Sequence, residues 1–351
     1  MTNKKLAIHH KPGSFSEKWI EYCECNNISY KIVNCYHTDI LKHLQDCDGL
    51  MWHWYHSDYK AIRFARQLIY SIEHSGKKVF PDSKTCWHFD DKVGQKYLLE
   101  SIGAPLVNTH VFYDKNEALA WADSASYPKV FKLRGGAGSL NVKLVKTKSE
   151  ASKLIHKAFG KGFNLFARQE KIIDRWQKFK RNKNCDTFLA LLRGLALFVY
   201  PGLSVDSRYS VKEKGYVYFQ DFIPANSHDI RVIVIGTRAF AIKRMVREGG
   251  FKASGSGMII HDNSQIPIEC IKLAFVMNGQ LKSQCTAFDF VFDNGIIKLL
   301  EISYGFSAQG YFDCPGYWDE KLVWHNGKFT SEFFMIEDFI KSTTQDLAGQ
   351  G

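Results

Sequence analysis

Proline, acidic side chains and long apolar runs are all scarce in this sequence. Only 8 of its 351 residues are proline and 45% are apolar, a composition that excludes collagen-like, low-complexity and disordered chains. The longest apolar stretch covers residues 187–203, contains Arg193, and is shorter than the roughly 20 residues that span a membrane. We therefore expect no transmembrane segment.

The sequence also shows neither the pattern of a secretory signal peptide nor the cysteine pattern of a disulfide framework. Residues 1–15 carry lysines but neither an apolar core nor a small-residue cleavage site. The cysteines number 9, an odd count, and no two of them form a CxxC pair. These absences predict a cytoplasmic protein with buried, reduced thiols, and they leave open a peripheral position at the inner face of a membrane.

Positive charge is in excess, and it is concentrated in one segment. The chain has 47 Lys and Arg against 36 Asp and Glu, a net charge of +11. Residues 128–217 alone hold 20 basic and 6 acidic side chains, which is a local net charge of +14. Such a segment favours nucleic acid, an anionic membrane or an acidic small molecule as its partner.

The first 80 residues alternate between strands and helices. Strands are expected at residues 5–9, 29–34, 49–53 and 78–81, and helices at 16–26, 40–47 and 60–74. This order predicts a parallel sheet, and ligands usually bind at the carboxyl ends of such strands. His9, His53 and His56 fall at two of those ends, where we expect them to line a cleft rather than to hold a metal ion.

The rest of the chain is richer in strands. Helices are expected at residues 91–102, 148–158, 264–277 and 333–340, and strands at 109–113, 129–133, 216–222, 230–235, 239–245, 286–292 and 296–302. A chain of this length exceeds one hydrophobic core, so two or three lobes are expected.

A hairpin around the turn Asp293–Gly295 carries the strongest motif. A three-residue loop would pair Asp289 with Leu299, which leaves Glu301 on the same face as Asp289. A two-residue loop would put the two carboxylates on opposite faces, because side chains alternate along a strand. Carboxylates that share an apolar face would suit Mg²⁺ and phosphate oxygens, whereas two ordinary surface acids are the alternative.

A second motif joins a lysine to a glycine-rich loop. Lys132 ends a strand, and residues 134–139 (RGGAGS) follow before the chain returns as a strand. Glycine lets backbone N–H groups approach phosphate oxygens, and the lysine adds a positive charge. A flexible turn that binds nothing is the alternative, since the spacing matches neither a Walker A loop nor a Rossmann fingerprint.

A third motif consists of cations on two strands joined by the Gly236 turn. Arg231 and Lys243 each project from an otherwise apolar face of their strand. A cation in such a place needs a nearby anion, which is either a bound phosphate or a surface carboxylate.

In this order the motifs resemble those of the ATP-grasp superfamily. The matching parts are Lys92 in a helix, Lys132 before the glycine-rich loop, the strand 218–223 (YFQDFI), the D-x-R strand pair, and D-x11-E-x-S at residues 289–303. The run DIRV…AIKR is most similar to the ribosomal-protein glutamate ligase branch. Residues 80–310 carry the resemblance.

The resemblance implies an α/β fold of the α+β ATP-grasp type. An N-terminal Rossmann-like parallel sheet would be followed by two grasp subdomains that clamp ATP. The Rossmann-like domain would cover residues 1–85, the first grasp subdomain or lid 86–217, with a basic helical insert at 168–200, and the second subdomain, with the metal site, 218–345.

The resemblance also implies roles for individual residues. Those expected to bind ATP are Lys92, Lys132, Arg134, Gly135, Gly136, Gly138, Ser139, Gln220, Asp221, Phe222 and Ile223. The catalytic residues would be Arg231, Lys243 and Arg244, and the ligands of Mg²⁺, or of Mn²⁺ in its place, would be Asp289, Glu301 and Ser303. The sequence departs from the family pattern at Ser303, where Asn is usual, and at Asp221, where Glu is common.

The implied activity is the ligation of a carboxylate to an amine through an acylphosphate, with release of ADP and phosphate. An attacking thiol in place of the amine stays open. Relatives with a similar stretch 304–319 look like proteins associated with bacterial surface polysaccharides, such as capsules, which suggests a uronic acid of a polysaccharide precursor as the carboxylate. The basic stretch 171–183 would bind this acidic acceptor. The sequence is also compatible with a homodimer. The alternatives are a non-catalytic nucleotide-binding protein and a module that binds nucleic acid or a membrane.

Overall fold

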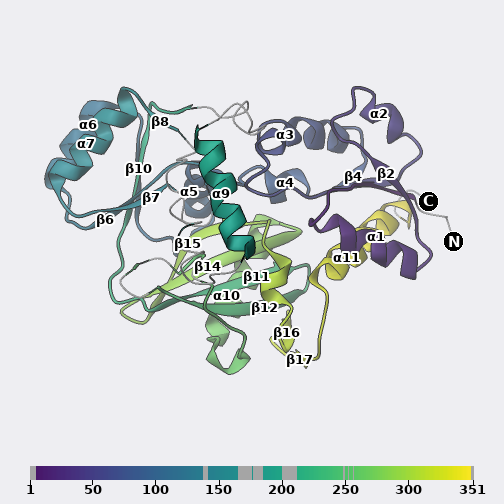
Figure 1. Ribbon diagram of the computed structural model, residues 1–351. Coiled ribbons are helices and arrows are strands. Elements are labelled where there is room, and N and C mark those ends of the chain that lie inside the picture. Colours follow the sequence, from purple (N-terminus) through teal and green to yellow (C-terminus); the bar gives the residue numbers. More distant parts are fainter. Residues whose placement is uncertain are drawn as a thin grey trace. The chain divides into compact units, whose positions relative to one another are not determined.

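Two compact units make up the chain (Figure 1). The computed structural model describes residues 5–136, 141–164, 176, 185–199, 212–247, 250–251, 253–255 and 257–348. The first unit contains residues 1–57, 64–107 and 223–351, and the second contains 58–63 and 108–222. The three-part division drawn from the resemblance stays a prediction. Within the described ranges, no helix combines the length and the apolar character that crossing a bilayer requires.

A parallel sheet opens the first unit. Its strands are β1 (Lys5–His9), β2 (Ser29–Val33), β3 (Gly49–Trp52) and β4 (Lys78–Phe80), in the order β2-β1-β3-β4. The connecting helices are α1 (Ser16–Cys25), α2 (Ile40–His43) and α3 (Tyr59–His74). The predicted parallel arrangement is confirmed. It follows from the alternation of strand and helix, because each helix returns the chain to the end of the sheet at which the previous strand began.

The first unit also contains a 7-stranded antiparallel sheet in the order β15-β14-β11-β12-β16-β17, with β13 paired to β12. Its strands are β11 (His228–Ile235), β12 (Arg238–Met245), β13 (Ile259–Ile260), β14 (Cys285–Asp293), β15 (Ile296–Ser303), β16 (Gly316–Asp319) and β17 (Trp324–Asn326). The helices of this part are α4 (Ser83–Cys86), α5 (Lys92–Ser101), η3 (Asn263–Gln265), α10 (Ile268–Leu281), η4 (Ala308–Tyr311) and α11 (Ser331–Ala348).

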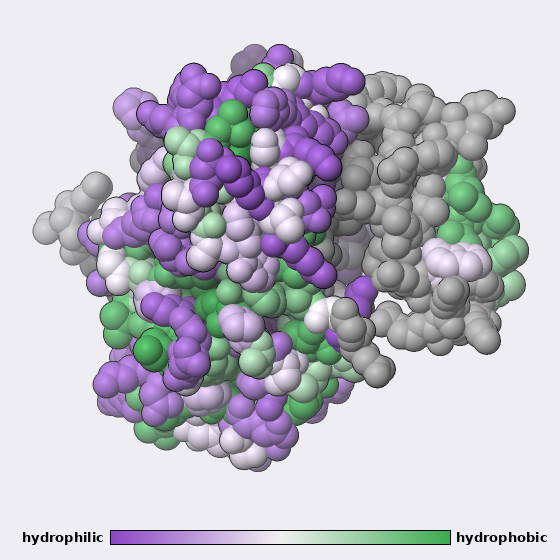
Figure 2. All heavy atoms as spheres, turned by 90° about the vertical axis from the view of Figure 1, so that its left-hand side faces the viewer, coloured by the Kyte–Doolittle hydropathy of each residue, from purple (hydrophilic) through white to green (hydrophobic). Residues whose placement is uncertain are grey.

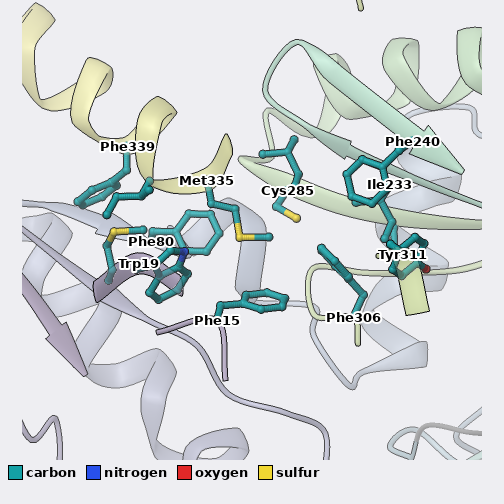
Figure 3. Close-up of a cluster of buried hydrophobic side chains, with 14 of the residues drawn as sticks. Phe15, Trp19, Phe80, Ile233, Phe240, Cys285, Phe306, Tyr311, Met335 and Phe339 are labelled. Carbon is teal, nitrogen blue, oxygen red and sulfur yellow. The ribbon is translucent and has the colours of Figure 1, made fainter. Parts of the chain in front are cut away.

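One apolar core links the parallel sheet, one face of the 7-stranded sheet and α11 (Figure 3). Trp19 of α1 and Phe80 of β4 contact each other edge to face, with ring centroids 5.4 Å apart. Met335 and Phe339 extend the cluster from α11, and Ile233 extends it from β11. Burying each such side chain contributes roughly 1.5–3 kcal/mol, so this core holds the two sheets of the unit together.

The opposite face of the 7-stranded sheet packs against α10. Val232 and Val234 of β11 lie in a cluster with Ile271 and Ala274 of that helix. Neighbouring residues of β11 therefore enter two different cores, as the alternation of side chains requires.

The second unit is built on a 4-stranded antiparallel sheet in the order β5-β10-β6-β7. Its strands are β5 (Thr109–Phe112), β6 (Lys129–Lys132), β7 (Val142–Val145) and β10 (Val217–Asp221), and β8 (Phe163–Asn164) pairs with β9 (Lys212–Glu213). Helices α6 (Lys115–Ser124) and α7 (Lys148–Phe159) lie together on one face, and α9 (Cys185–Val199) follows β8 (Figure 1). Phe131 and Phe219 of the sheet enter the core beneath α6 and α7.

Several features differ from the sequence-based expectation, as three helices show. Helix α10 begins at Ile268 rather than at residue 264, because Pro267 holds the residue before it in an extended conformation. Helix α11 runs on to Ala348 instead of ending at residue 340. Helix α6 was not expected, although Asp114 caps it by accepting hydrogen bonds from the backbone of Asn116 and Glu117.

Candidate functional site

The hairpin β14–β15 brings the two predicted metal-binding acids together by an unexpected route. Its loop is the two-residue turn Asn294–Gly295, with φ angles of 50° and 82°, so the structure has the shorter of the two loops that the sequence left open. A β-bulge next to Asp289 then adds one residue to β15, and Asp289 pairs directly with Glu301. The carboxylates therefore share one face, whereas a two-residue loop without the bulge would have placed them on opposite faces, and Leu299 pairs with Phe290.

Asp289 is the centre of a buried network of two acids and two arginines. Arg231, which is opposite Asp289 on β11, donates from Nε and Nη2 to its two carboxylate oxygens, both at 2.5 Å. Arg244 of β12 lies 2.9 Å from Asp289 through Nη2 and also donates to both oxygens of Asp229, at 2.6 and 2.7 Å. The four formal charges cancel, which is the condition for burying them.

The two acids of this network differ in acidity. Burial raises the pKa of Asp229, and the charge of Arg244 offsets this only in part. Burial also acts to raise the pKa of Asp289, but the charges of Arg231 and Arg244 and their hydrogen bonds outweigh it and hold that pKa well below its usual range. Asp289 is therefore ionised at neutral pH.

Glu301 is the more accessible acid of the pair, with 31% of its side chain exposed. Its carboxylate lies 3.7 Å from Nζ of Lys92, the first residue of α5. Lys92 was predicted to bind phosphate, and within the first unit the structure places it beside the acid pair.

Ser303 also lies on this face, two residues beyond Glu301. Its hydroxyl donates to the carbonyl oxygen of Gly305 at 2.7 Å, and His56 Nε2 lies 3.5 Å from the hydroxyl oxygen. His56 is itself paired through Nδ1 with Asp90 at 3.1 Å. His56 thus lies between the hydroxyl of Ser303 and the carboxylate of Asp90.

Lys243 does not join the group. It pairs in register with Ile230, whereas Arg231 pairs with Ile242, so the side chains of Lys243 and Arg231 project from opposite faces. Nζ of Lys243 donates to Gln265 at 3.2 Å. Of the three predicted catalytic residues, only Arg231 and Arg244 lie beside Asp289.

In the second unit, a chain of hydrogen-bonded polar side chains crosses the sheet face opposite α6 and α7. Lys132 Nζ donates to Gln220 Oε1 at 2.7 Å, and the Gln220 amide nitrogen donates to Thr109 at 3.1 Å. Lys132 and Gln220 are adjacent in register to Phe131 and Phe219, which point into the helix-covered core, so the polar pair must point the other way. The structure therefore brings together two of the residues predicted to bind ATP.

Asp221 lies on the other face of the same sheet. It accepts from Nζ of Lys129 at 2.5 Å and from the side-chain amide of Asn108 at 3.2 Å. After Asp221 the chain passes from one unit to the other, because Phe222 is the last residue of the second unit and Ile223 belongs to the first.

The glycine-rich loop is described only in part. Arg134 donates to Glu213 at 3.1 and 3.4 Å, and its backbone N–H donates to the Tyr216 hydroxyl at 2.7 Å. Gly135 follows it, and Gly136 has a φ of 113°, which favours glycine. Gly138, Ser139 and the basic stretch 171–183, apart from Trp176, lie outside the described residues.

Two histidines of the first unit are fully buried. His53 accepts a backbone hydrogen bond from Phe15 at Nδ1, and its Nε2 lacks a partner among the described residues. His88 has no partner there for either ring nitrogen. Burial, with a contribution from the charge of Arg66, lowers the pKa of His88 to about 4, and burial lowers that of His53 as well.

Carboxylate oxygens are the donors that Mg²⁺ takes in proteins, and Asp289 and Glu301 present them from opposed positions on one face, so the donor set fits this ion. A ligand must be ionised, and the arginines ensure this for Asp289. The described residues contain no group of three or more His, Cys, Asp or Glu side chains that could hold a metal ion, so Asp289 and Glu301 would need other oxygen donors to complete a site.

Several side chains of these groups were given no role from the sequence, among them Asp229, Lys129 and Thr109. Asp229 could have been found, because it lies two residues before Arg231 and shares its buried face, where a carboxylate requires a cation. The other two depend on the pairing of β5, β6 and β10, which the sequence does not reveal.

The fold is similar to those of several solved structures. A RimK domain protein ATP-grasp from Sphaerobacter thermophilus DSM 20745 has a TM-score of 0.54 at 13% identity, covering 95% of this chain and 98% of that one. The D-alanine–D-alanine ligase from Bacillus anthracis, complexed with ATP, has a TM-score of 0.57 at 12% identity, covering 99% and 100%. The biotin carboxylase domain of the Hydrogenobacter thermophilus 2-oxoglutarate carboxylase has a TM-score of 0.57 at 10% identity, covering 95% and 68%. At these identities the likeness establishes the fold.

A sequence comparison agrees over part of the chain. Residues 91–186 match the family model of the carbamoyl-phosphate synthase L chain, ATP binding domain. No curated protein sequence matches this one.

Proposed function

We propose that this chain belongs to the ATP-grasp superfamily and is an ATP-dependent ligase that joins a carboxylate to an amine. The observation that carries the proposal is the opposed pair Asp289 and Glu301, set beside Arg231 and Arg244 on one sheet face. Phosphoryl transfer depends on cations that bind the phosphates and on carboxylates that hold a metal ion, more than on a strong base. This sheet face carries the two arginines and the opposed pair of carboxylates.

The second unit would contribute nucleotide-binding groups. Lys132 would bind phosphate oxygens, because its ammonium group lies on the sheet face opposite α6 and α7, beside Gln220. Gln220, which accepts a hydrogen bond from Lys132, would offer its amide and backbone to the adenine. The match of residues 91–186 to an ATP binding domain supports this assignment.

In the first unit, Asp289 and Glu301 would hold Mg²⁺, with Ser303 as a further oxygen, and the bound cation would offset the negative charge of the phosphates. Lys92 would bind phosphate beside Glu301. Mn²⁺ would satisfy the same oxygen donors.

Arg231 is the arginine best placed to act on the reacting groups. It uses Nε and Nη2 for Asp289, and no described residue binds its Nη1, so hydrogens remain for a phosphate. A carboxylate oxygen of the substrate would attack the γ-phosphorus of ATP, releasing ADP and forming an acylphosphate. The amine nitrogen would then attack the acyl carbon, so that phosphate leaves and the nitrogen loses a proton.

For the acceptor we propose a uronic acid of a bacterial surface polysaccharide precursor. The basic composition of residues 171–183 supports an acidic acceptor. Because the proposed reaction would consume ATP, a cytoplasmic location belongs to the same proposal. A non-catalytic nucleotide-binding protein is the second candidate, favoured by Ser303, whose hydroxyl is engaged with Gly305.

The test is an assay of Mg²⁺-dependent ADP release over a panel of uronic acids and amines, with hydroxylamine added to trap the acylphosphate as a hydroxamate. Glu301→Gln should reduce ADP release by at least about 100-fold through loss of a charge beside the phosphates. Glu320→Gln changes an exposed acid of the same unit and should leave the rate unchanged. Full activity of Glu301→Gln would refute the site, and ATP binding without ADP release over the whole panel would favour the non-catalytic candidate.

A further inference from the structure

The chain that leaves β15 packs beside β13 through the short helix η4. Nε2 of His261, the residue after β13, lies 2.8 Å from the carbonyl oxygen of Gly310. A Cβ atom at Gly310 would lie 3.9 Å from Cδ1 of Ile259, which belongs to β13. The backbone N–H of Cys314 donates to the carbonyl oxygen of Tyr311 at 3.0 Å. These contacts fix the position of Tyr311, the last residue of η4.

The ring of Tyr311 lies on the sheet face that carries the arginines of the candidate site. It contacts Phe240 and Phe306 edge to face, at centroid distances of 5.4 and 5.3 Å (Figure 3). Phe240 of β12 pairs in register with Ile233 of β11, and Ile233 is two residues from Arg231. Residues two apart on a strand share a face, so Phe240 and Arg231 are diagonal neighbours. Tyr311 therefore packs on the same face as Arg231 and close to it.

The phenol of Tyr311 interacts with the buried network of charges. The charges of Arg231, Arg244 and Asp289 all act on the pKa of Tyr311, and Tyr311 acts in turn on the pKa of Arg231. Burial is the largest effect and raises the pKa of Tyr311 to about 12, so the hydroxyl keeps its proton at neutral pH. The side chain is 5% exposed, and none of the described residues forms a hydrogen bond with its hydroxyl.

A hydroxyl donor beside a guanidinium favours an anionic ligand. Carboxylate and phosphate oxygens accept hydrogen bonds from both groups, whereas the attacking amine already has hydrogens and brings no negative charge. We propose that Tyr311 is a catalytic residue whose hydroxyl donates a hydrogen bond to the substrate carboxylate, next to the phosphate bound by Arg231. The proposal rests on the ligase function and adds to it the residue that recognises the carboxylate.

The hydrogen bond has a role in both steps of the reaction. One carboxylate oxygen attacks the γ-phosphorus of ATP, and Tyr311 binds the other, which becomes the carbonyl oxygen of the acylphosphate. When the amine nitrogen attacks the acyl carbon, the electron pair of the C=O bond moves onto this oxygen. A donor that is already in place stabilises the charge as it develops. The pair returns to form the amide carbonyl as phosphate leaves, and Tyr311 keeps its proton throughout.

A purely structural role is the alternative, because the ring of Tyr311 belongs to the apolar core of the first unit. The 37% exposure of its neighbour Ile259 is ordinary, since apolar residues lie among hydrophilic ones over the face of the molecule in Figure 2. A phenylalanine would fill the same position in the core without a polar atom that needs a partner. The core therefore explains the ring but not the hydroxyl.

Tyr311→Phe separates the two roles, because it removes the hydroxyl and keeps the ring. In the assay of Mg²⁺-dependent ADP release, with the best acid of the panel, kcat should fall about 10- to 100-fold while KM for ATP stays within about twofold of the parent. Urea unfolding should show the variant to be at least as stable as the parent. The matched control is Tyr317→Phe, at a partly buried tyrosine that stacks on His325, and its kcat should stay within about twofold of the parent.

A second measurement does not depend on turnover. The protein is labelled with 3-fluorotyrosine, and the fluorine signal of Tyr311 is assigned by its loss in Tyr311→Phe. Inorganic phosphate is then added to the complex with MgADP. The Tyr311 signal should shift and that of Tyr317 should not, and Arg231→Met should abolish the shift because it removes the cation that holds the anion.

The two measurements distinguish failure of this proposal from failure of the ligase function. If the parent releases ADP and Tyr311→Phe matches it, the role of Tyr311 is overturned and the ligase function stands. If no acid supports ADP release but phosphate shifts the Tyr311 signal, the ligase function fails and Tyr311 stands as an anion-binding residue. A Tyr311 signal that phosphate does not move would overturn the proposal in either case.

Discussion

Substitution of the buried His88 should make the protein more resistant to acid. The pKa of this histidine falls from about 6.5 in the unfolded chain to about 4 in the fold, because burial and the charge of Arg66 disfavour the imidazolium. Between these values the unfolded chain binds the proton first. The contribution of His88 to stability is therefore complete above about pH 6.5 and is lost as the pH falls toward 4.

The size of the effect follows from the two values. At about pH 5 the linkage relation gives a loss of roughly 2 kcal/mol relative to neutral pH, and the full shift corresponds to about 3.4 kcal/mol. His88→Leu removes the titrating group and also two ring nitrogens without described partners. We expect the variant to be equal to or up to about 1 kcal/mol more stable than the parent at neutral pH, and to lose about 2 kcal/mol less on acidification.

The assay is urea unfolding followed by tryptophan fluorescence at about pH 7.5, 6 and 5, with free energies from linear extrapolation. His74→Gln, at an exposed position of the same unit, is the control and should follow the parent at every pH. The variant will keep some pH dependence, because burial also lowers the pKa of His53. If the parent and His88→Leu lose the same free energy between neutral pH and pH 5, the reasoning about His88 is refuted.

Two further predictions concern the candidate site. Arg244→Met leaves the buried Asp229 without its bidentate partner and should lower the free energy of unfolding, measured in urea, by about 3–5 kcal/mol. The double variant Asp229→Asn/Arg244→Met should recover most of this loss. Additive losses would show that the two side chains do not interact. Lys132→Met should weaken ATP binding about 10- to 100-fold in calorimetry. Lys129→Met removes the partner of Asp221 on the other sheet face, so it should lower the stability of the protein and leave its affinity for ATP within about threefold. Equal losses of ATP affinity in the two variants would contradict the assigned faces.

The strands of the parallel sheet and the helices that connect them could be predicted because the local pattern of apolar residues differs between the two. The 49–52 and 78–80 strands, for example, are short apolar runs between helices. The register of the β14–β15 hairpin could not be predicted in this way. Asn294–Gly295 suits a two-residue loop, but no residue of the hairpin marks the bulge beside Asp289 in the sequence, and Arg231, which binds that carboxylate, comes from a different strand, β11.

In the candidate site, too, some residues could be predicted from the local sequence, whereas others depend on which strands pair. Arg231, Asp289 and Glu301 could be selected from the sequence, since charged residues on apolar strands are conspicuous. The sequence could not exclude Lys243, because the choice between Lys243 and Arg244 depends on which residue of β12 pairs with Asp229. The exposure of the apolar side chains of α9 was also beyond reach, because an apolar helix is usually read as core.

The bulge in β15 also bears on how related sequences should be recognised. It absorbs one residue between Asp289 and Glu301, so a chain with one residue fewer in this hairpin could present the same two carboxylates from a regular ladder. Insertions or deletions of a single residue are therefore tolerated here as long as a bulge appears or disappears with them. A search that fixes the spacing between the two acids would miss such chains, whereas one that lets the spacing vary by one residue would find them.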